Sequence, residues 1–126
     1  MASTNKVLIA EDSSVIQNLV KKILEFQNFE ITVVKNGEQV IQLLGKEHFD
    51  VILLDINMPV MDGMECVKAI RGLSNAKTAA IPVVAITGNA RNYSDADFTA
   101  AGFNDVLMKP LNFDRLVSVV KSLTDK

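Results

Sequence analysis

The stretch that decides the fold of this chain is Val51-Ile52-Leu53-Leu54-Asp55-Ile56-Asn57-Met58-Pro59. Its first four residues are apolar without interruption, which is typical of a strand buried on both faces of a sheet. Four further runs of this kind, most of them rich in β-branched residues, lie at 7–10, 31–34, 83–86 and 106–108. The sequence therefore predicts five short buried strands, the third of which ends at Asp55.

Helical patterns fill the intervals between these strands. The clearest runs from Val15 to Leu24, where apolar residues recur at i, i+1, i+4, i+5, i+8 and i+9. Similar stripes lie at 40–44, 64–70 and 113–123, and Ser94 with Asp97 predicts the capped start of a weaker helix. Residues 74–80 are small and polar, and we expect a loop there.

Strands that alternate with helices must pair in parallel, because each helix carries the chain back across the sheet. The expected fold class is α/β, a (βα)5 unit whose open, doubly wound parallel sheet of five strands has helices on both faces. No linker, internal repeat or low-complexity tract interrupts the pattern. With 126 residues the chain has the size of one domain, so we expect a single domain over residues 1–126.

Charge and cysteine content exclude several classes of function. Thirteen Lys and Arg against fifteen Asp and Glu give a net charge of −2, which offers no electrostatic footprint for nucleic acid or an anionic membrane. The single cysteine, Cys66, excludes an internal disulfide framework and a CxxC site. No apolar run approaches the roughly 18 residues of a membrane span, and no signal peptide follows Met1. We expect a soluble, cytoplasmic domain without nucleic-acid or membrane partners.

Polar residues that could bind a ligand or take part in catalysis follow four of the strands. In an open parallel sheet, functional groups collect beyond the carboxyl ends of the strands. Glu11 and Asp12 follow the first strand, Asp55 ends the third, Thr87 and Gly88 follow the fourth and Lys109 follows the fifth. Converging carboxylates repel one another unless a cation joins them, and Mg²⁺ suits such oxygen ligands. A metal ion, an ammonium and a hydroxyl around a carboxylate form a setting for phosphoryl transfer, with Asp55 as the candidate acceptor.

Together these residues resemble the receiver domain of two-component response regulators. The resemblance extends from Val7 to Leu123 and rests on Glu11-Asp12, Asp55, Met58-Pro59, Asp62-Gly63, Thr87-Gly88 and Lys109-Pro110, in order and spacing. It implies a flavodoxin-like sheet with the strand order 2-1-3-4-5. The segments 58–63 and 85–90 are also similar to the receivers of hybrid histidine kinases.

The resemblance implies a role in phosphorelay signal transduction for the acidic residues. Asp55 would be the phosphoacceptor, which takes a phosphoryl group from a phosphohistidine on a histidine kinase or a histidine phosphotransfer protein. Glu11 and Asp12 would hold Mg²⁺, with Asp55 and the backbone carbonyl of Asn57 completing the protein ligands. Such a domain catalyses its own phosphorylation and dephosphorylation but turns over no separate substrate, so we expect a signalling protein that switches partner binding, and not an enzyme.

Roles for the remaining strand-end residues follow from the same resemblance. Thr87 would be the switch hydroxyl that moves toward the phosphoryl oxygens, and Lys109 would pair with the phosphate. Gly88 would leave room beside the phosphoryl group. The peptide bond before Pro110 is expected to be cis, which an X-Pro bond adopts at modest cost.

One position departs from the family pattern. Three residues before Lys109 the family often has Tyr or Phe, a rotating aromatic that reports phosphorylation to the output face, whereas this chain has Val106. The usual relay from threonine to aromatic is therefore in doubt. As a hypothesis, the signal travels instead through the loop that holds Arg91, Asn92 and Tyr93. The downstream partner and the pathway stay open.

Three other functions compete with a phosphorylated receiver. A phosphatase similar to haloacid dehalogenases would carry its nucleophile after the first strand in an Asp-x-Asp motif, but Glu11-Asp12-Ser13 stands there. A flavin- or nucleotide-binding module would need an anion cradle at that place, where two acidic residues repel a phosphate. A degenerate receiver that binds partners without phosphorylation is kept open by Val106.

Four further residues have structural interpretations. His48, the only histidine, lies at the wrong end of the sheet for a catalytic or metal site, and we expect it to be solvated. Cys66 is expected to be a small core residue. Asp62-Gly63 is expected to form a turn and the start of the third helix.

Overall fold

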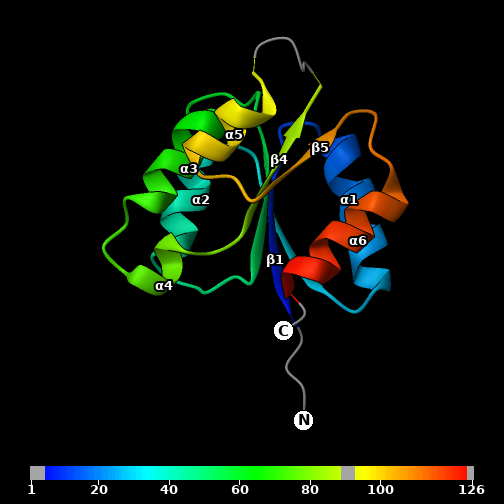
Figure 1. Cartoon of the computed structure of the whole chain (residues 1–126). Helices are drawn as coiled ribbons and strands as arrows, with labels where there is room; N and C mark the ends of the chain where they lie inside the picture. Colours follow the sequence, from blue (N-terminus) through cyan, green and yellow to red (C-terminus); the bar gives the residue numbers. More distant parts are fainter. Residues whose placement is uncertain (1–4, 89–92, 125–126) are drawn as a thin grey trace.

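The computed structural model describes residues 5–88 and 93–124, which form one sheet covered by helices on both faces (Figure 1). The five strands pair in parallel in the order β2-β1-β3-β4-β5. They are β1 (Lys6–Ala10), β2 (Glu30–Val34), β3 (Val51–Asp55), β4 (Val83–Thr87) and β5 (Asp105–Met108). The predicted α/β class, the parallel pairing and the strand order implied by the resemblance are all confirmed.

The expected helices are present as α1 (Ser14–Phe26), α2 (Gly37–Leu44), α3 (Gly63–Arg71), α5 (Asp95–Ala101) and α6 (Phe113–Thr124). The capped start of α5 is confirmed, because Ser94 and Asp97 form a capping box. No helix of the described residues is long and apolar enough to cross a membrane.

The expected loop at residues 74–80 is wrong in part, because it contains the one-turn helix α4 (Ala76–Ala79). The side chain of Asn75 caps this turn by accepting a hydrogen bond from the N–H of Thr78 at 3.1 Å. None of the residues of α4 is buried, so no apolar pattern marks it in the sequence.

Two hydrophobic clusters hold the layers together. Helices α2, α3 and α5 cover one face of the sheet, and α1 and α6 cover the other (Figure 1). The central strand β3 serves both faces: Ile52 and Leu54 belong to the first cluster, Val51 and Leu53 to the second, and all four are fully buried. Each such side chain contributes roughly 1.5–3 kcal/mol by leaving water. Asp55 is thus the last residue of the central strand, whose side chains are buried on both faces of the sheet.

The start of α3 is packed directly against the end of β3. A Cβ atom added at Gly63 would lie 2.5 Å from the carbonyl oxygen of Asp55, which only a glycine avoids. Asp62 caps the helix in a capping box with Glu65, which confirms the expected helix start at Asp62-Gly63. This close approach fixes the backbone at Asp55 from the side of α3.

Candidate functional site

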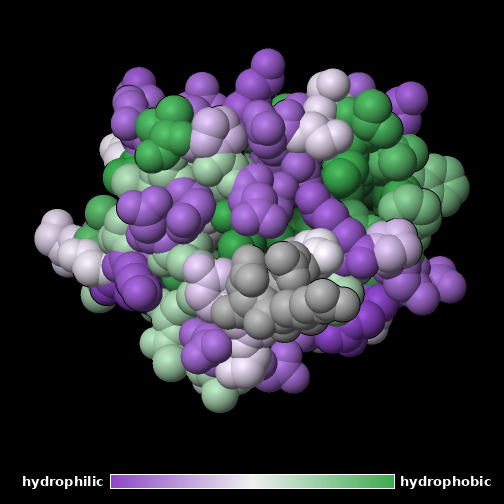
Figure 2. Space-filling model, turned by 90° about the horizontal axis from the view of Figure 1, so that it is seen from above, coloured by the Kyte–Doolittle hydropathy of each residue, from purple (hydrophilic) through white to green (hydrophobic). Residues whose placement is uncertain are grey.

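Acidic, hydroxyl and basic side chains meet at the carboxyl edge of the sheet. Glu11 follows β1, Asp55 ends β3, Thr87 ends β4 and Lys109 follows β5. Three of them are nearly inaccessible, with 1% of Glu11, 3% of Asp55 and 1% of Thr87 exposed. Seen from this edge, hydrophilic residues cross the middle of the face and hydrophobic ones gather beside them (Figure 2). The fold therefore brings together four of the residues that the sequence singled out.

Lys109 joins the two buried carboxylates. Its Nζ lies 3.2 Å from Oε1 of Glu11 and 3.2 Å from Oδ2 of Asp55. Burial lowers the pKa of Lys109, but the negative charges of Asp55 and Glu11 outweigh it, so that the net shift is upward. The ammonium is therefore charged at neutral pH and occupies the centre of the site.

Glu11 has an environment that disfavours its negative charge. Burial raises the pKa of Glu11, and the adjacent Asp55 raises it further, while the N–H of Ser13 and Lys109 act in the opposite direction. Two buried carboxylates share a single ammonium, so the group carries an excess of negative charge. A further cation at this edge would lower the electrostatic free energy of the site.

Backbone hydrogen bonds hold both carboxylates in place. The N–H of Ser13 donates to Oε2 of Glu11 at 2.9 Å, and the N–H of Asn57 donates to Oδ1 of Asp55 at 3.2 Å. The N–H of Lys109 donates to the carbonyl oxygen of Thr87 at 2.8 Å, which ties the fifth strand end to the fourth. The site is thus built on strand ends and their first turns, with little freedom for its side chains.

Three further predicted residues line this edge. Asp12 and Asn57 are exposed, whereas Glu11 and Asp55 are buried. Gly88 is exposed, and a Cβ added there would come within 3.7 Å of the Lys109 side chain, an ordinary van der Waals contact. The peptide bond between Lys109 and Pro110 is cis.

The family of the chain is decided by comparison with known proteins. The family model for the response regulator receiver domain matches residues 7–121. The chain belongs to this family. Such receivers act in two-component phosphorelay signal transduction.

Relatives of this receiver occur in kinases and in response regulators. Hybrid signal transduction histidine kinase I of Dictyostelium discoideum is 34% identical over 122 residues, which cover 93% of this chain and 7% of the kinase. Transcriptional regulatory protein CpxR of Escherichia coli is 31% identical over 94% of the chain and 49% of the regulator. The chain therefore spans less than half the length of these relatives.

Solved receiver structures match the fold over nearly the whole chain. The receiver domain of a sensor histidine kinase from Pseudomonas aeruginosa, with a magnesium ion coordinated in its active site cleft, has a TM-score of 0.88 and 27% identity. It covers 98% of this chain and 100% of that one. The chemotaxis response regulator CheY4 of Vibrio cholerae has a TM-score of 0.86 and 30% identity, and covers 96% and 99%.

The residues present fit a magnesium ion in this receiver, although the ligands are not all gathered. Oε1 of Glu11 is buried and, among the described residues, has only the ion pair with Lys109 and no further hydrogen bond, and the site carries an excess of negative charge. Within residues 5–88 and 93–124, however, no three Asp, Glu, His or Cys side chains are grouped to hold a metal. A metal bound by few carboxylates, one carbonyl and several waters is the arrangement that Mg²⁺ favours.

Val106, which stands where the family often has Tyr or Phe, lies beside a cluster of aromatic side chains. Val106 is half-buried and packs against the cluster that contains Phe98 and Phe103, whose rings stand edge to face 5.8 Å apart. The ring of Tyr93 packs on that of Phe98, with the two ring centroids 5.6 Å apart. Arg91 and Asn92, which belong to the alternative signal route considered above, lie outside the described residues.

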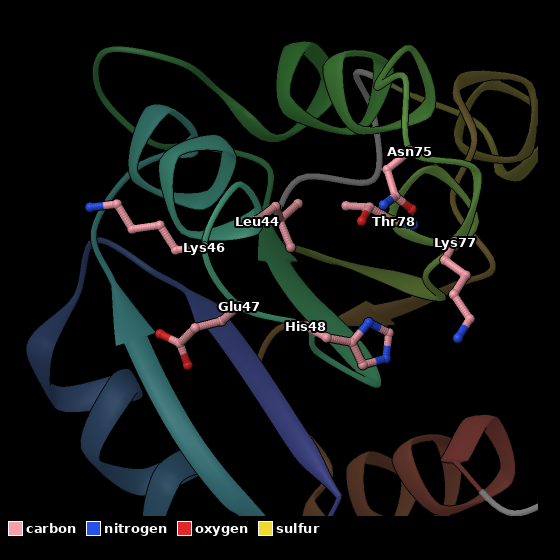
Figure 3. A pocket seen from close by; sticks show the side chains of 7 residues that line it. All are labelled: Leu44, Lys46, Glu47, His48, Asn75, Lys77 and Thr78. Atoms are coloured by element: carbon pink, nitrogen blue, oxygen red, sulfur yellow. Dashed lines mark hydrogen bonds between the residues drawn. The ribbon is translucent and has the colours of Figure 1, made fainter.

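His48 and Cys66 lie away from the site. His48 is exposed at the opposite edge of the sheet, 3.6 Å from Asp50, and lines a hollow of about 310 Å³ with Lys77 (Figure 3). Cys66 is fully buried among core residues, as expected. Neither belongs to the group at the carboxyl edge.

Sequence reasoning missed one residue that supports the site. Gln17 is buried on α1, and its side-chain amide donates hydrogen bonds to the backbone carbonyl oxygens of Glu11 and Val34. The available signal was a polar residue among the apolar residues of α1, next to Ile16. Such a residue in a buried stripe indicates a hydrogen-bonding role.

Proposed function

We propose that Asp55 accepts a phosphoryl group from a phosphohistidine on a histidine kinase or a histidine phosphotransfer protein, in a Mg²⁺-dependent reaction. The domain, which we take to span residues 1–126, then changes its affinity for a protein partner. One observation carries the proposal: Asp55 and Glu11, both buried, share the Lys109 ammonium at 3.2 Å in a member of the receiver family.

The chemistry proceeds at the Asp55 carboxylate. One of its oxygens attacks phosphorus, the bond between phosphorus and the donor imidazole nitrogen breaks, and the electron pair stays on that nitrogen. The other ring nitrogen of the donor carries a proton, so the products are an acyl phosphate on Asp55 and a neutral imidazole. No separate substrate is turned over, which is why we regard the domain as a signalling module.

Positive charge around Asp55 makes the attack feasible. Lys109 already lies 3.2 Å from Oδ2 and would pair with an oxygen of the incoming phosphoryl group. When bound, Mg²⁺ would supply further neutralisation of the phosphoryl charge, held by Glu11, Asp12, Asp55 and the carbonyl of Asn57. The magnesium ion in the cleft of the Pseudomonas receiver supports this assignment.

Thr87 and Gly88 would complete the phosphoryl site. The hydroxyl of Thr87 would donate a hydrogen bond to a phosphoryl oxygen, and Gly88, which has no side chain and lies next to Lys109, would leave room for the group. A movement of Thr87 on phosphorylation would be the first step of switching. Because Val106 replaces the usual aromatic, later steps would differ from the common relay.

Intact mass spectrometry after incubation with acetyl phosphate tests the proposal. Wild type with Mg²⁺ should gain one labile phosphoryl group, whereas wild type with EDTA and Asp55→Asn with Mg²⁺ should gain none. Asp114→Asn is the matched control, because Asp114 is exposed at the start of α6 and should leave the reaction unchanged.

A phosphorylation-independent receiver is the second candidate, favoured only by Val106. If wild type gains no phosphoryl group and beryllofluoride, a phosphoryl mimic, does not bind, the proposed chemistry is wrong and the domain is a binding module. Phosphorylation of Asp55→Asn to the wild-type level would also contradict the assignment of the acceptor.

A further inference from the structure

Gln17 is a buried polar residue whose role lies beyond the family's catalytic set. Only 6% of it is exposed, and it occupies the first of three buried positions on α1, ahead of Val20 and Leu24. The other two are apolar and pack in the core. A buried amide is costly unless its polar atoms are hydrogen-bonded, so its contacts indicate what it does.

The amide of Gln17 joins the ends of two neighbouring strands. Its Nε2 donates to the carbonyl oxygen of Glu11, directly after β1, and to that of Val34, the last residue of β2, at 3.2 Å. The N–H of Glu11 donates to the same Val34 oxygen at 3.0 Å. Both partners of the amide are backbone carbonyls, which require the NH₂ group as donor.

Gln17 also holds the other end of the loop that carries Glu11 and Asp12. The N–H of Gln17 donates to the carbonyl oxygen of Ser13 at 3.0 Å, and the N–H of Ser13 donates to the Glu11 carboxylate. The side chain of Gln17 therefore binds the start of the segment 11–13, and its main chain binds the end. Gln17 therefore contacts both ends of the loop that orients the Glu11 carboxylate.

We propose that Gln17 is a positioning residue for the metal site: by fixing the backbone of Glu11 it holds the Glu11 carboxylate, and the loop with Asp12, in the orientation that a divalent cation requires. This inference rests on the proposed function. Replacement of residues that orient metal ligands typically lowers metal affinity by roughly 10–100-fold. Gln17 itself touches neither the metal nor the reacting atoms.

The inference is tested by measuring the binding of Mn²⁺ to Gln17→Met with electron paramagnetic resonance. Methionine keeps the length and helix propensity of glutamine but has no donor. We expect Mn²⁺ affinity to fall about tenfold, while the phosphorylation rate with acetyl phosphate recovers at saturating Mg²⁺. Gln42→Met is the control, because Gln42 is exposed on α2 and should bind Mn²⁺ like wild type.

A double-mutant cycle separates positioning from a general structural effect. If Gln17 acts through Glu11, adding Gln17→Met to Glu11→Gln should weaken Mn²⁺ binding far less than it does in wild type. An equal loss in both backgrounds, or unchanged Mn²⁺ affinity in Gln17→Met, would overturn the inference. If Gln17→Met does not fold, Gln17→Asn carries the same expectation, because its amide is one carbon too short.

The Mn²⁺ titration of wild type distinguishes failure of the proposed function from failure of the role assigned to Gln17. If wild type binds no Mn²⁺, the metal part of the proposed function fails and this inference fails with it. If wild type binds Mn²⁺ and is phosphorylated but the Gln17 variants bind equally well, the inference alone is wrong.

Discussion

Val60 adopts a backbone conformation that β-branched residues rarely take. Its φ of +69° lies in the left-handed region, and the N–H of Met61 donates to the carbonyl oxygen of Pro59 at 2.7 Å across it. This is a γ-turn with positive φ, a strained form. Val60 is 74% exposed, so its side chain contributes little burial in return. The strain lies in the loop that follows Asp55 and Asn57.

We expect Val60→Gly to stabilise the protein by about 1 kcal/mol, because relief of roughly 1–3 kcal/mol of strain exceeds the entropy cost of glycine. Urea unfolding measures the change. Val15 is the matched control, since it is similarly exposed but helical, and Val15→Gly should destabilise by about 0.4 kcal/mol. Destabilisation by both substitutions would contradict the strain at Val60.

Cys66 should be unreactive in the folded protein. Burial raises the pKa of its thiol to about 12, with a smaller contribution from the charge of Asp62. Because the thiolate is the nucleophile, iodoacetamide at pH 8 should alkylate the unfolded chain in urea but not the folded protein. Raising the pH to about 9 should accelerate only the unfolded-chain reaction. Intact mass reports both rates, and rapid alkylation of the folded protein would contradict the burial of the thiol.

At the scale of elements, Arg71 joins α3 to the segment 79–81 at the end of α4 and to the segment 102–104 before β5. Its guanidinium donates to the carbonyl oxygens of Gly102, at 2.7 and 3.0 Å, and to those of Ala79 and Ile81, at 2.8 and 2.7 Å. A further bond reaches Oδ1 of Asn104 at 2.9 Å. The fork of five N–H donors serves several acceptors at fixed angles, which a lysine cannot do.

Arg71→Lys should therefore destabilise the protein by roughly 2–3 kcal/mol, because several carbonyl oxygens lose a charged donor. Arg115→Lys is the control. Arg115 is exposed and its bridge to Asp105 spans 3.2 Å, so its replacement should cost less than about 0.5 kcal/mol. Equal midpoints of urea unfolding for wild type and Arg71→Lys would show that these bonds contribute little.

The elements were predicted where apolar patterns mark them and missed where they do not. The five buried runs became strands, and three strands begin one residue earlier than predicted, at Lys6, Glu30 and Asp105. Those three residues are polar but pair in the sheet, Lys6 with Glu30 and Asp105 with Val84, which hydrophobicity does not reveal. Helix α4 was missed because a side-chain cap, and not burial, starts it.

At the scale of the whole molecule, the strand order turns four separate sequence signals into one site. Glu11, Asp55, Thr87 and Lys109 could be predicted because each stands at the carboxyl end of a strand. Gln17 could not be assigned a partner, because its bond to Val34 joins residues 17 positions apart that only the β1–β2 pairing brings together. The different exposure of Asp12 and Glu11, which are adjacent, also follows only from the fold.

Magnesium should stabilise the folded domain as a whole. At a concentration ten times its dissociation constant, a ligand that binds only the folded state adds about 1.4 kcal/mol, which raises the Tm by roughly 4–7 °C for a domain of this size. We expect this rise for wild type and for the surface control Asp114→Asn, and a much smaller one for Asp55→Asn. Equal rises in all three proteins, measured by circular dichroism, would mean that Asp55 does not hold the metal.

The most direct test of the account is to locate the phosphoryl group. Borohydride reduces an acyl phosphate to an alcohol, so an aspartyl phosphate becomes homoserine, which peptide sequencing by mass spectrometry identifies. After phosphorylation with acetyl phosphate and Mg²⁺, the account predicts homoserine at position 55 and unmodified Glu11 and Asp12. Reduction at Asp12, or an unmodified Asp55 in protein that carries the phosphoryl group, would contradict it.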